Sequence, residues 1–231
     1  MTHTKPTLYM FPASTTCRPI LLFCAQHGIE LEHVVVNLMT GEHMADAYRS
    51  INPAQRVPVL RDGALLLTES SSILKYLAEK VNSPTYPKGD PIRRARINER
   101  MDWFNTGFYM DFGYNLVYPQ VLPHIKRSDA DVQAATLELG ASNSARWLTQ
   151  LDEHWIGPER NYVCDDEISL ADYFGWGLVS MGELIGQRLE RYPNVTRWLE
   201  TMNRLPASTE VNAAFDGWVA SLDGQSFRSV A

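Results

Sequence analysis

The sequence predicts an α/β domain over residues 1–82, a linker over residues 83–91 and an all-helical domain over residues 92–231. Three observations support this organisation. Hydrophobic residues up to residue 81 alternate between the two-residue period of strands and the longer period of helices. The segment 83–91 (SPTYPKGDP) then contains three prolines and a glycine, which interrupt regular structure. Beyond this segment only helical patterns are found.

The composition is that of a folded protein of one or two domains. Its 231 residues are 45% hydrophobic and 21% charged, a balance that can bury enough apolar surface to offset the entropy of ordering the chain. Lys and Arg number 21 against 27 Asp and Glu, which gives a net charge of −6. A chain without excess positive charge is a poor match for a polyanion, so we expect no nucleic-acid partner.

The cysteines and histidines indicate neither a disulfide framework nor a metal site. Cys17, Cys24 and Cys164 form no CxxC pair and are odd in number, which predicts a reducing, cytoplasmic location. His27 and His33 are the closest pair of histidines, and their spacing fits no helical pair of metal ligands. We therefore expect no metal. No signal-peptide pattern and no apolar run of membrane-spanning length is found, so we also expect no membrane partner.

The first domain begins with a strand, a helix and a second strand. Residues 7–11 (TLYMF) are typical of a short buried strand, and the helix that follows has Pro19 in its first turn and Gly28 at its end. Residues 31–36 (LEHVVV) form a second strand rich in β-branched residues. If the two strands are parallel neighbours, the connection between them is right-handed.

A short helix and a hairpin follow. Residues 41–51 predict a loop with a short helix, and residues 57–60 predict a strand with Pro58 near its start. Asp62-Gly63 is typical of a two-residue hairpin turn, which joins that strand to an antiparallel strand over residues 64–68.

One more helix completes the first domain. Ser70 can cap a helix over residues 71–81, because serine is a favoured residue at the N-cap. The apolar residues of this helix fall on one stripe, which predicts one buried face; they are Ile73, Leu74, Leu77 and Val81. This order of strands and helices is that of a thioredoxin-like layer.

The second domain is predicted to be a bundle of helices. Its sharpest local signal is Ser169 followed three residues later by Asp172, the pattern of a capping box in which each residue satisfies a free amide of the other. The predicted helices cover residues 92–119, 129–152, 169–187, 193–205 and 208–221.

Two residues between the first strand and the first helix are candidates for chemistry. Ser14 can place its hydroxyl at the positive end of the helix dipole, where an anion is stabilised, or it can simply cap the helix. Cys17 is near the same helix terminus, where the pKa of a thiol can be lowered, although without a CxxC partner it is more often a packed thiol.

Further polar residues suit an extended peptide with charged ends. A cis bond at Pro58 would expose the backbone of Val57 to pair with such a peptide. Glu69 can hold an ammonium group, while the helix beginning at Ser70 offers free amides to a carboxylate. His43 and Arg56 can bind a second carboxylate, and the alternative for each is a surface role. Together these groups describe a zwitterionic head, an extended peptide and a distant carboxylate.

The chain resembles a glutathione transferase along nearly its whole length, and most closely the theta and delta classes. The run LYMFPASTTCRPI resembles the entry of those enzymes, in which the serine three residues before Cys-Arg is the catalytic hydroxyl; that serine is Ser14. The run GEHM places His43 at the position that binds the glycine carboxylate of glutathione. The ISLAD stretch and the YP…RRAR region extend the resemblance into the helical domain.

The glutathione-binding residues follow from two further motifs of the family. The run NPAQRVPVL resembles the cis-proline segment, with Pro58 as the structural cis-proline and Val57 as the residue that pairs with the cysteinyl backbone. In that run Arg56 stands where theta enzymes often have lysine. The run TESSSIL places Glu69 and Ser70 at the γ-glutamyl site.

The resemblance implies that glutathione is a co-substrate whose thiol Ser14 activates as a thiolate. Lowering a free thiol pKa of about 8.5 by roughly two units corresponds to about 2.7 kcal/mol. A hydrogen bond to charged sulfur supplies about 1.5 to 3 kcal/mol and a helix terminus about 0.3 to 1 kcal/mol, so together they are sufficient. The thiolate would attack an apolar, for example halogenated, electrophile bound between the domains. Residues of one helix offer aromatic and apolar surface for that pocket, or for the core: Trp103, Phe104, Phe108, Tyr109, Met110, Phe112, Tyr114 and Tyr118.

The sequence departs from the family pattern at two places. Thr16 stands where proline is usual, and Thr106-Gly107 replace an acidic and a basic residue that in some theta enzymes reach the neighbouring subunit's site. The family nevertheless implies a symmetric homodimer.

Other activities remain open from the sequence. Glutathione-dependent thiol/disulfide chemistry, in which Cys17 forms a mixed disulfide, or glutathione-dependent peroxide reduction is one alternative, and a non-catalytic dimeric binding module is another. A maleylacetoacetate-isomerase-like role has weaker support, because the stretch around Cys17 lacks the tryptophan of that class.

Overall fold

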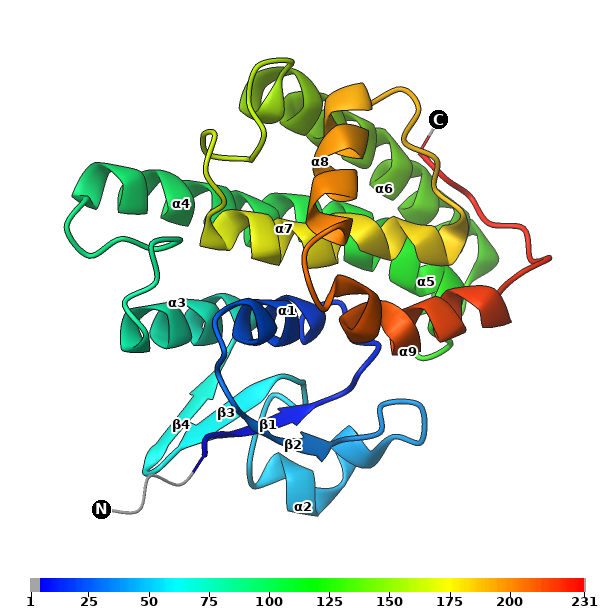
Figure 1. The fold of residues 1–231 in the computed structure, drawn as a ribbon. Coiled ribbons are helices and arrows are strands. Elements are labelled where there is room, and N and C mark those ends of the chain that lie inside the picture. Colours follow the sequence, from blue (N-terminus) through cyan, green and yellow to red (C-terminus); the bar gives the residue numbers. More distant parts are fainter. Residues whose placement is uncertain (1–4, 231) are drawn as a thin grey trace.

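The computed structural model describes residues 5–230, and its first part is a four-stranded mixed sheet with helices on both faces (Figure 1). The strand order is β2-β1-β3-β4. Strands β1 and β2 are parallel, whereas β3 runs antiparallel to both β1 and β4. This is the thioredoxin-like layer that the order of elements predicts. The strands are β1 (Thr7–Met10), β2 (Glu32–Val35), β3 (Val59–Asp62) and β4 (Leu65–Thr68).

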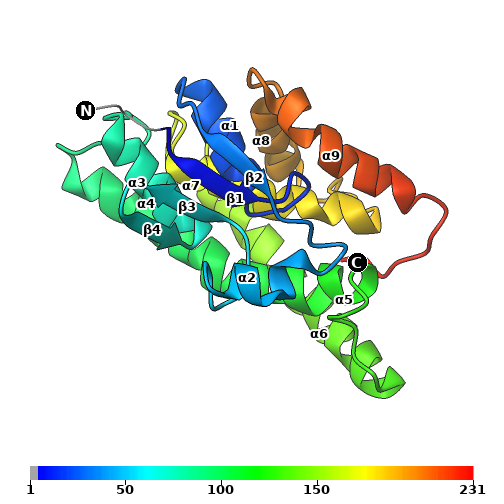
Figure 2. The ribbon, with the colours of Figure 1, turned by 90° about the horizontal axis from the view of Figure 1, so that it is seen from below.

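The helices of this part lie on opposite sides of the sheet. Helices α1 (Arg18–Gln26) and α3 (Ser70–Lys80) lie between the sheet and the helical part, so their buried faces pack in the centre of the molecule (Figure 1). The short η1 (Glu42–Met44) and α2 (Asp46–Arg49) follow β2 in the chain, and α2 lies on the other side of the sheet, which faces the viewer in Figure 2. Helix α1 ends as expected, because Gly28 adopts a positive φ of 62°.

The hairpin turn lies one residue later than the sequence indicates. Asp62 is still paired with Leu65, so the two loop residues are Gly63 and Ala64 rather than Asp62 and Gly63. Gly63 has a φ of 59°, and glycine is the residue that occupies a positive φ at the first loop position without strain. The prediction of a two-residue hairpin is confirmed, while its register was wrong by one residue.

Helix α3 also begins one residue earlier than predicted. Ser70 is its first residue and Glu69 occupies the N-cap position with a φ of 64°, so Ser70 does not cap the helix. Neither residue gives the helix a side-chain cap. Ile73 is fully buried, whereas Val81 lies beyond the end of the helix and is exposed. The buried stripe is therefore one residue shorter than expected.

The second part, residues 91–221, consists of helices and their connecting loops and is centred on one long, nearly continuous helix. This helix changes from α-helical to π-helical geometry and back along its length. Phe104, Phe108 and Phe112 recur at every fourth position and are all fully buried, so they form the centre of the helical core. The three segments are α4 (Pro91–Trp103), η2 (Phe104–Val117) and α5 (Tyr118–Val121).

The helix over residues 130–150 and the helical segments over residues 170–185 pack against this long helix, and the last two helices pack outside them (Figure 1). Asp129 caps the next helix by accepting hydrogen bonds from the amides of Asp131 and Val132, each at 2.9 Å. The segments are α6 (Ala130–Gln150), η3 (Leu151–Ile156), α7 (Leu170–Ser180), η4 (Met181–Ile185), α8 (Pro193–Asn203) and α9 (Ser208–Ser221). Between residues 5 and 230, no helix combines the length and the apolar composition needed to cross a bilayer.

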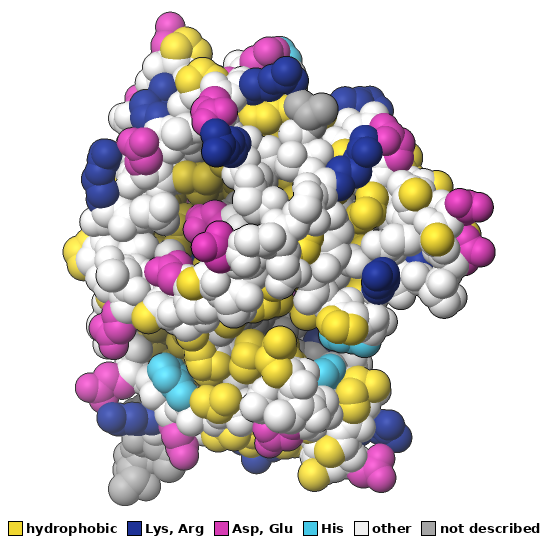
Figure 3. Space-filling view, turned by 90° about the vertical axis from the view of Figure 1, so that its right-hand side faces the viewer, with side chains coloured by type: hydrophobic (Ala, Val, Ile, Leu, Met, Phe, Trp, Pro, Cys, Tyr) yellow, Lys and Arg dark blue, Asp and Glu magenta, His cyan; other side chains and the backbone are white. Residues whose placement is uncertain are grey.

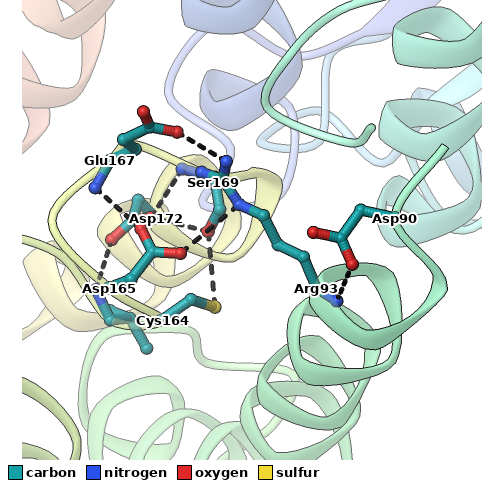
Figure 4. Close-up of polar contacts among 8 residues, drawn as sticks. Asp90, Arg93, Cys164, Asp165, Glu167, Ser169 and Asp172 are labelled. Atoms are coloured by element: carbon teal, nitrogen blue, oxygen red, sulfur yellow. Dashed lines mark hydrogen bonds and ion pairs between the residues drawn. The ribbon is translucent and has the colours of Figure 1, made fainter. Parts of the chain in front are cut away.

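The predicted capping box at the start of α7 is formed, and it is part of a larger buried network (Figure 4). The carboxylate of Asp172 accepts hydrogen bonds from the amide and the hydroxyl of Ser169, at 2.8 and 2.7 Å. It also accepts from the amide of Val163 at 2.8 Å and from the indole of Trp198 at 3.0 Å. Burial nevertheless raises the pKa of Asp172 to about 6. Four donors thus hold one carboxylate in the helical core.

A second polar group in Figure 4 connects the start of α4 to the loop before α7. The amide of Arg93 donates to the Asp90 carboxylate at 2.9 Å, which caps α4. The guanidinium of Arg93 forms ion pairs with Asp165 at 3.3 Å and Glu167 at 2.5 Å. These ion pairs therefore hold the loop before Ser169 against the start of α4.

A buried arginine joins the two parts of the molecule. Arg18, at the start of α1, is fully buried and donates to the Gly177 carbonyl at 3.3 Å and to the Ser180 hydroxyl at 3.1 Å. It also donates to Asn212 of α9 at 2.8 Å and lies 3.7 Å from the ring centroid of Phe215. Burial lowers the pKa of Arg18 to about 10, which leaves it charged at neutral pH. The charge is thus used for anchoring α1 against α7 and α9.

Candidate functional site

The register of the sheet brings the candidate residues to one edge of the sheet, at the ends of the strands. Tyr9 of β1 is paired with Val59 of β3, and Val59 is paired with Thr68 of β4. The chain after β1, the chain before β3 and the chain after β4 therefore leave the sheet at the same end. These three segments carry Ser14, Val57 and Glu69 respectively.

Ser14 does not cap helix α1. The N-cap residue is Cys17, which makes no side-chain cap, and it is the backbone carbonyl of Ser14 that accepts from the amides of Cys17 and Arg18, each at 3.1 Å. The Ser14 hydroxyl is half-buried; the Thr16 amide donates to it at 3.4 Å, and the Thr16 hydroxyl lies 3.3 Å away. The hydroxyl is therefore not used by the helix.

The environment of the Cys17 thiol does not suit a nucleophile. Its side chain is fully buried, and this burial raises the pKa of its thiol to about 11 in spite of hydrogen bonds with the Ser14 side chain and the Phe11 backbone, which lower it. A nucleophilic cysteine needs an accessible thiolate at neutral pH. The thiol of Cys17 is protonated there and packed inside the molecule.

The segment before β3 is held tightly by backbone contacts. The bond between Val57 and Pro58 is cis. The Val57 carbonyl accepts a hydrogen bond from the Thr16 hydroxyl at 3.3 Å, which joins this segment to the Ser14 loop. The preceding carbonyl, of Arg56, accepts from the Tyr48 hydroxyl at 2.8 Å and from the Asn52 amide group at 2.7 Å.

Backbone strain is found on both sides of this segment. Gln55 and Glu69 have positive φ values of 54° and 64°, a region that residues other than glycine rarely adopt. Such conformations cost about 1 to 3 kcal/mol each and are frequent at functional sites. The side chain of Glu69 is exposed, whereas Ser70 beside it is buried at the start of α3. The Glu69 carboxylate is therefore accessible to solvent beside a strained backbone.

His43 lies in η1 and faces the helical part. Its Nδ1 is buried without a hydrogen-bond partner, and its ring centroid is 6.5 Å from that of His124, in the loop after α5. Partial burial, with a smaller effect of His124, lowers the pKa of His43. The segment is tied to the rest of the site because the Gln55 side chain donates to the Met44 carbonyl at 3.0 Å. His124 was not among the residues that the sequence pointed to.

Tyrosines of the long helix approach the site from the helical part. The exposed guanidinium of Arg56 lies 5.7 Å from the ring centroid of Tyr114. The hydroxyls of Tyr109 and Tyr118 are 2.9 Å apart, and Tyr118 also forms a hydrogen bond with Thr15, next to Ser14. Burial raises the pKa of Tyr118 to about 12 and that of Tyr109 well above its usual value, so both phenols stay protonated. Figure 3 shows one face of the molecule, with hydrophobic side chains gathered where the helical part meets the α/β part and histidines close to them.

The other residues of the predicted aromatic set have different positions. Phe104, Phe108 and Phe112 belong to the core, while Met110 is half-exposed. Trp103 packs among other aromatic rings, 4.1 Å from the ring centroid of Trp155. Of this set, Tyr114 lies near Arg56, and Tyr118 bonds to Thr15, next to Ser14. Within residues 5–230 there is no cluster of three or more side chains that could hold a metal ion.

Comparison with known proteins agrees with this architecture. Residues 8–85 match the family model described as "Glutathione S-transferase, N-terminal domain", and residues 119–206 match "Glutathione S-transferase, C-terminal domain". Among curated proteins, mouse "Glutathione S-transferase theta-1" is 31% identical over 206 residues, which cover 84% of this chain and 80% of the mouse protein.

Solved structures with the same fold include two that cover nearly the whole chain. A delta-class glutathione transferase of Nilaparvata lugens is 27% identical, with a TM-score of 0.78 over 94% of this chain and 99% of that chain. Human glutathione transferase theta-2, in complex with glutathione and an unknown ligand, is 24% identical, with a TM-score of 0.82 over 97% of this chain and 93% of that chain. At 24% identity, the similarity to the human enzyme shows a common fold.

Proposed function

Because the chain belongs to the glutathione S-transferase family and is such a transferase, we propose that it holds the sulfur of glutathione as a thiolate beside the Ser14 hydroxyl, for attack on an apolar electrophile. The observation that carries the proposal is the position of this hydroxyl. It takes no part in capping α1 and lies at the sheet edge formed with Val57, while the neighbouring Cys17 is buried and protonated. Hydrogen bonding by Ser14 stabilises the charged form of the sulfur more than the neutral form, which lowers the pKa of the thiol.

The remaining candidate residues suit the other parts of glutathione. The backbone of Val57 pairs with the cysteinyl residue, in the manner of a peptide added to a strand. The exposed carboxylate of Glu69 holds the γ-glutamyl ammonium, and the start of α3 at Ser70 binds the γ-glutamyl carboxylate. His43 and Arg56 bind the glycine carboxylate. The strained backbone at Glu69 supports this assignment, because such conformations are frequent at functional sites.

The role of His43 predicts tighter binding of S-methylglutathione at lower pH. In the free protein, burial lowers the pKa of His43, so the ring is neutral at pH 7. A bound carboxylate favours the protonated ring and raises this pKa, so affinity increases as pH falls between the two values. We expect calorimetry to show a gain of about three- to tenfold from about pH 7.5 to about pH 5.5. S-methylglutathione is used because it has no thiol to titrate.

The matched control for that experiment is the exposed His33 on β2. His43→Gln should abolish the pH dependence, whereas His33→Gln should preserve it. If the gain in affinity persists in His43→Gln, another group binds the glycine carboxylate and the assignment of His43 is wrong.

We place the electrophile between the two parts of the molecule, against the tyrosines of the long helix. Tyr118 touches Thr15 and Tyr114 lies under Arg56, so a molecule bound there would be adjacent to the sulfur at Ser14. The rings offer an apolar surface with polar tips, which suits a mainly hydrophobic substrate, halogenated compounds included.

The wider setting of the enzyme follows from the same family membership. We propose two domains over residues 1–82 and 92–231, a symmetric homodimer and a cytoplasmic location. Large apolar side chains that remain exposed on the long helix and on α6 support the dimer, among them Met110 and Leu139. Three unpaired cysteines suit a reducing compartment.

A direct test of the proposed function is to titrate the thiol of bound glutathione. The absorbance of the thiolate, measured against pH with the protein in excess, should give a pKa about two units below the ordinary value of about 8.5. Conjugation of a general chloronitrobenzene electrophile should follow the same ionisation. A thiol that titrates on the protein as it does in buffer would contradict the proposal.

A further inference from the structure

We propose that Thr16 is a positioning residue, which couples docking of the peptide backbone at Val57 to the direction of the Ser14 proton. This inference rests on the proposed function and extends it to a residue outside the set assigned above. The structural basis is a chain of contacts from the Val57 carbonyl, through the Thr16 hydroxyl, to the Ser14 hydroxyl.

The number of protons in this chain determines the direction of its hydrogen bonds. A carbonyl can only accept, so at 3.3 Å the Thr16 hydroxyl donates its single proton to Val57. Thr16 then has only lone pairs to offer Ser14, also at 3.3 Å, and in that contact Ser14 must be the donor. In the free protein the Ser14 proton therefore points at Thr16. The Cys17 thiol also contacts Ser14, but sulfur is a weak acceptor and does not compete with the threonine oxygen.

The arrangement has to change when a thiolate is formed. Ser14 must then donate to the sulfur, which withdraws its proton from Thr16. If the Thr16 proton stayed on Val57, two hydroxyl oxygens would face each other at 3.3 Å without a proton between them. The favourable alternative is that the Thr16 hydroxyl rotates and donates to Ser14, while the cysteinyl N–H of the docked peptide takes its place on the Val57 carbonyl. No covalent bond is formed or broken in this exchange.

The exchange makes Ser14 a better donor in the bound state. Its oxygen then accepts from both the hydroxyl and the amide of Thr16, the latter already placed at 3.4 Å, and these bonds polarise the Ser14 O–H toward the sulfur. The proton of Ser14 is thus turned to the sulfur only when the peptide occupies Val57. A tripeptide would be activated, whereas a thiol without the backbone amide would not gain the same effect.

The test measures the pKa of the bound glutathione thiol in Thr16→Val, which keeps the shape of the side chain but lacks the hydroxyl. We expect this pKa to rise by about 0.5 to 1 unit, the effect of one lost neutral hydrogen bond. Thr16→Ser retains the hydroxyl and should restore the wild-type value. The affinity for S-methylglutathione should stay within about twofold in all three proteins, because the Val57 carbonyl accepts the cysteinyl N–H of the peptide in each, with or without a hydroxyl at residue 16 to displace.

Two further variants separate positioning from a purely structural role. Thr15→Val is the matched control, since this hydroxyl bonds to Tyr118, and it should leave the thiol pKa unchanged. In Ser14→Ala, adding Thr16→Val should cause no further rise, because Thr16 acts only through Ser14. Melting temperatures check that each variant is folded, and Thr16→Ala serves if the valine variant is not.

The outcomes distinguish this inference from the function on which it rests. A wild-type protein that does not lower the thiol pKa overturns both. A lowered pKa that Ser14→Ala abolishes but Thr16→Val and Thr16→Ala leave intact overturns the role of Thr16 alone. That role is also overturned if the valine variant loses affinity for S-methylglutathione with an unchanged thiol pKa, since this pattern indicates support of the Val57 backbone only.

Discussion

Replacing Ser14 by alanine should lower kcat/KM for conjugation by about 100-fold or more, and should return the pKa of the bound thiol close to that of free glutathione. The hydroxyl is the donor that the helix leaves available at the sheet edge, because the helix amides bond to the Ser14 carbonyl instead. Removing one donor that stabilises a developing or resident anion in an enclosed site typically costs about 100- to 1,000-fold in rate. The thiolate absorbance and steady-state kinetics of the variant measure the two effects separately.

The control for this experiment is Cys17→Ala. This thiol is fully buried and its pKa is raised, so its loss should change kcat/KM by less than about threefold, with a modest loss of stability from the small cavity. Affinity for S-methylglutathione should be preserved in both variants. If activity disappears in Cys17→Ala and survives in Ser14→Ala, the chemistry is thiol exchange through the cysteine and the proposed mechanism is wrong.

Replacing Asp172 by alanine should reduce the free energy of unfolding by about 3 to 5 kcal/mol. Its carboxylate accepts four hydrogen bonds in the helical core, and all four donors become unsatisfied when it is removed. Each buried unsatisfied donor costs about 1 to 3 kcal/mol, with partial relief where water enters the vacated space. This is a large part of the stability of a typical domain. Urea unfolding monitored by circular dichroism provides the measurement.

Two milder variants keep this prediction testable if the alanine protein does not fold. Ser169→Ala removes one of the four donors together with its acceptor contact, so a loss of about 1 kcal/mol is expected. Asp172→Asn preserves the shape but presents an amide donor to other donors, which should place it between the other two variants. Equal stability of Asp172→Asn and the wild type would indicate that the network contributes little.

The fold was largely predictable because its signals are local. The change of hydrophobic period along residues 7–68 and the capping box at Ser169 each depend on neighbours in the chain, and both were confirmed. The errors at the hairpin and at Ser70 are shifts of one residue, and the strand predicted over residues 57–60 lies two residues later, at β3. They arise because the exact boundary depends on which backbone groups pair across β3 and β4, and that pairing is not encoded in the turn residues alone.

The candidate site was predictable in part. The sequence pointed to Ser14 through its place before a helix, but left open whether its hydroxyl caps that helix. The structure answers this question, because the Ser14 carbonyl meets the helix amides and the hydroxyl takes no part in the cap. His124 could not be found from the sequence, since its relation to His43 exists only after the helical part packs on the α/β part.

Sequence patterns alone determined which elements form, how many parts the chain has and which residue types are placed at helix and strand ends, because these depend on interactions over a few residues. Only the tertiary structure decided that Cys17 is buried, that Arg18 faces the helical part and that Thr16 connects Ser14 to Val57. Burial and long-range hydrogen bonds join residues far apart in the chain, and the direction of a hydroxyl proton depends on all of its neighbours at once.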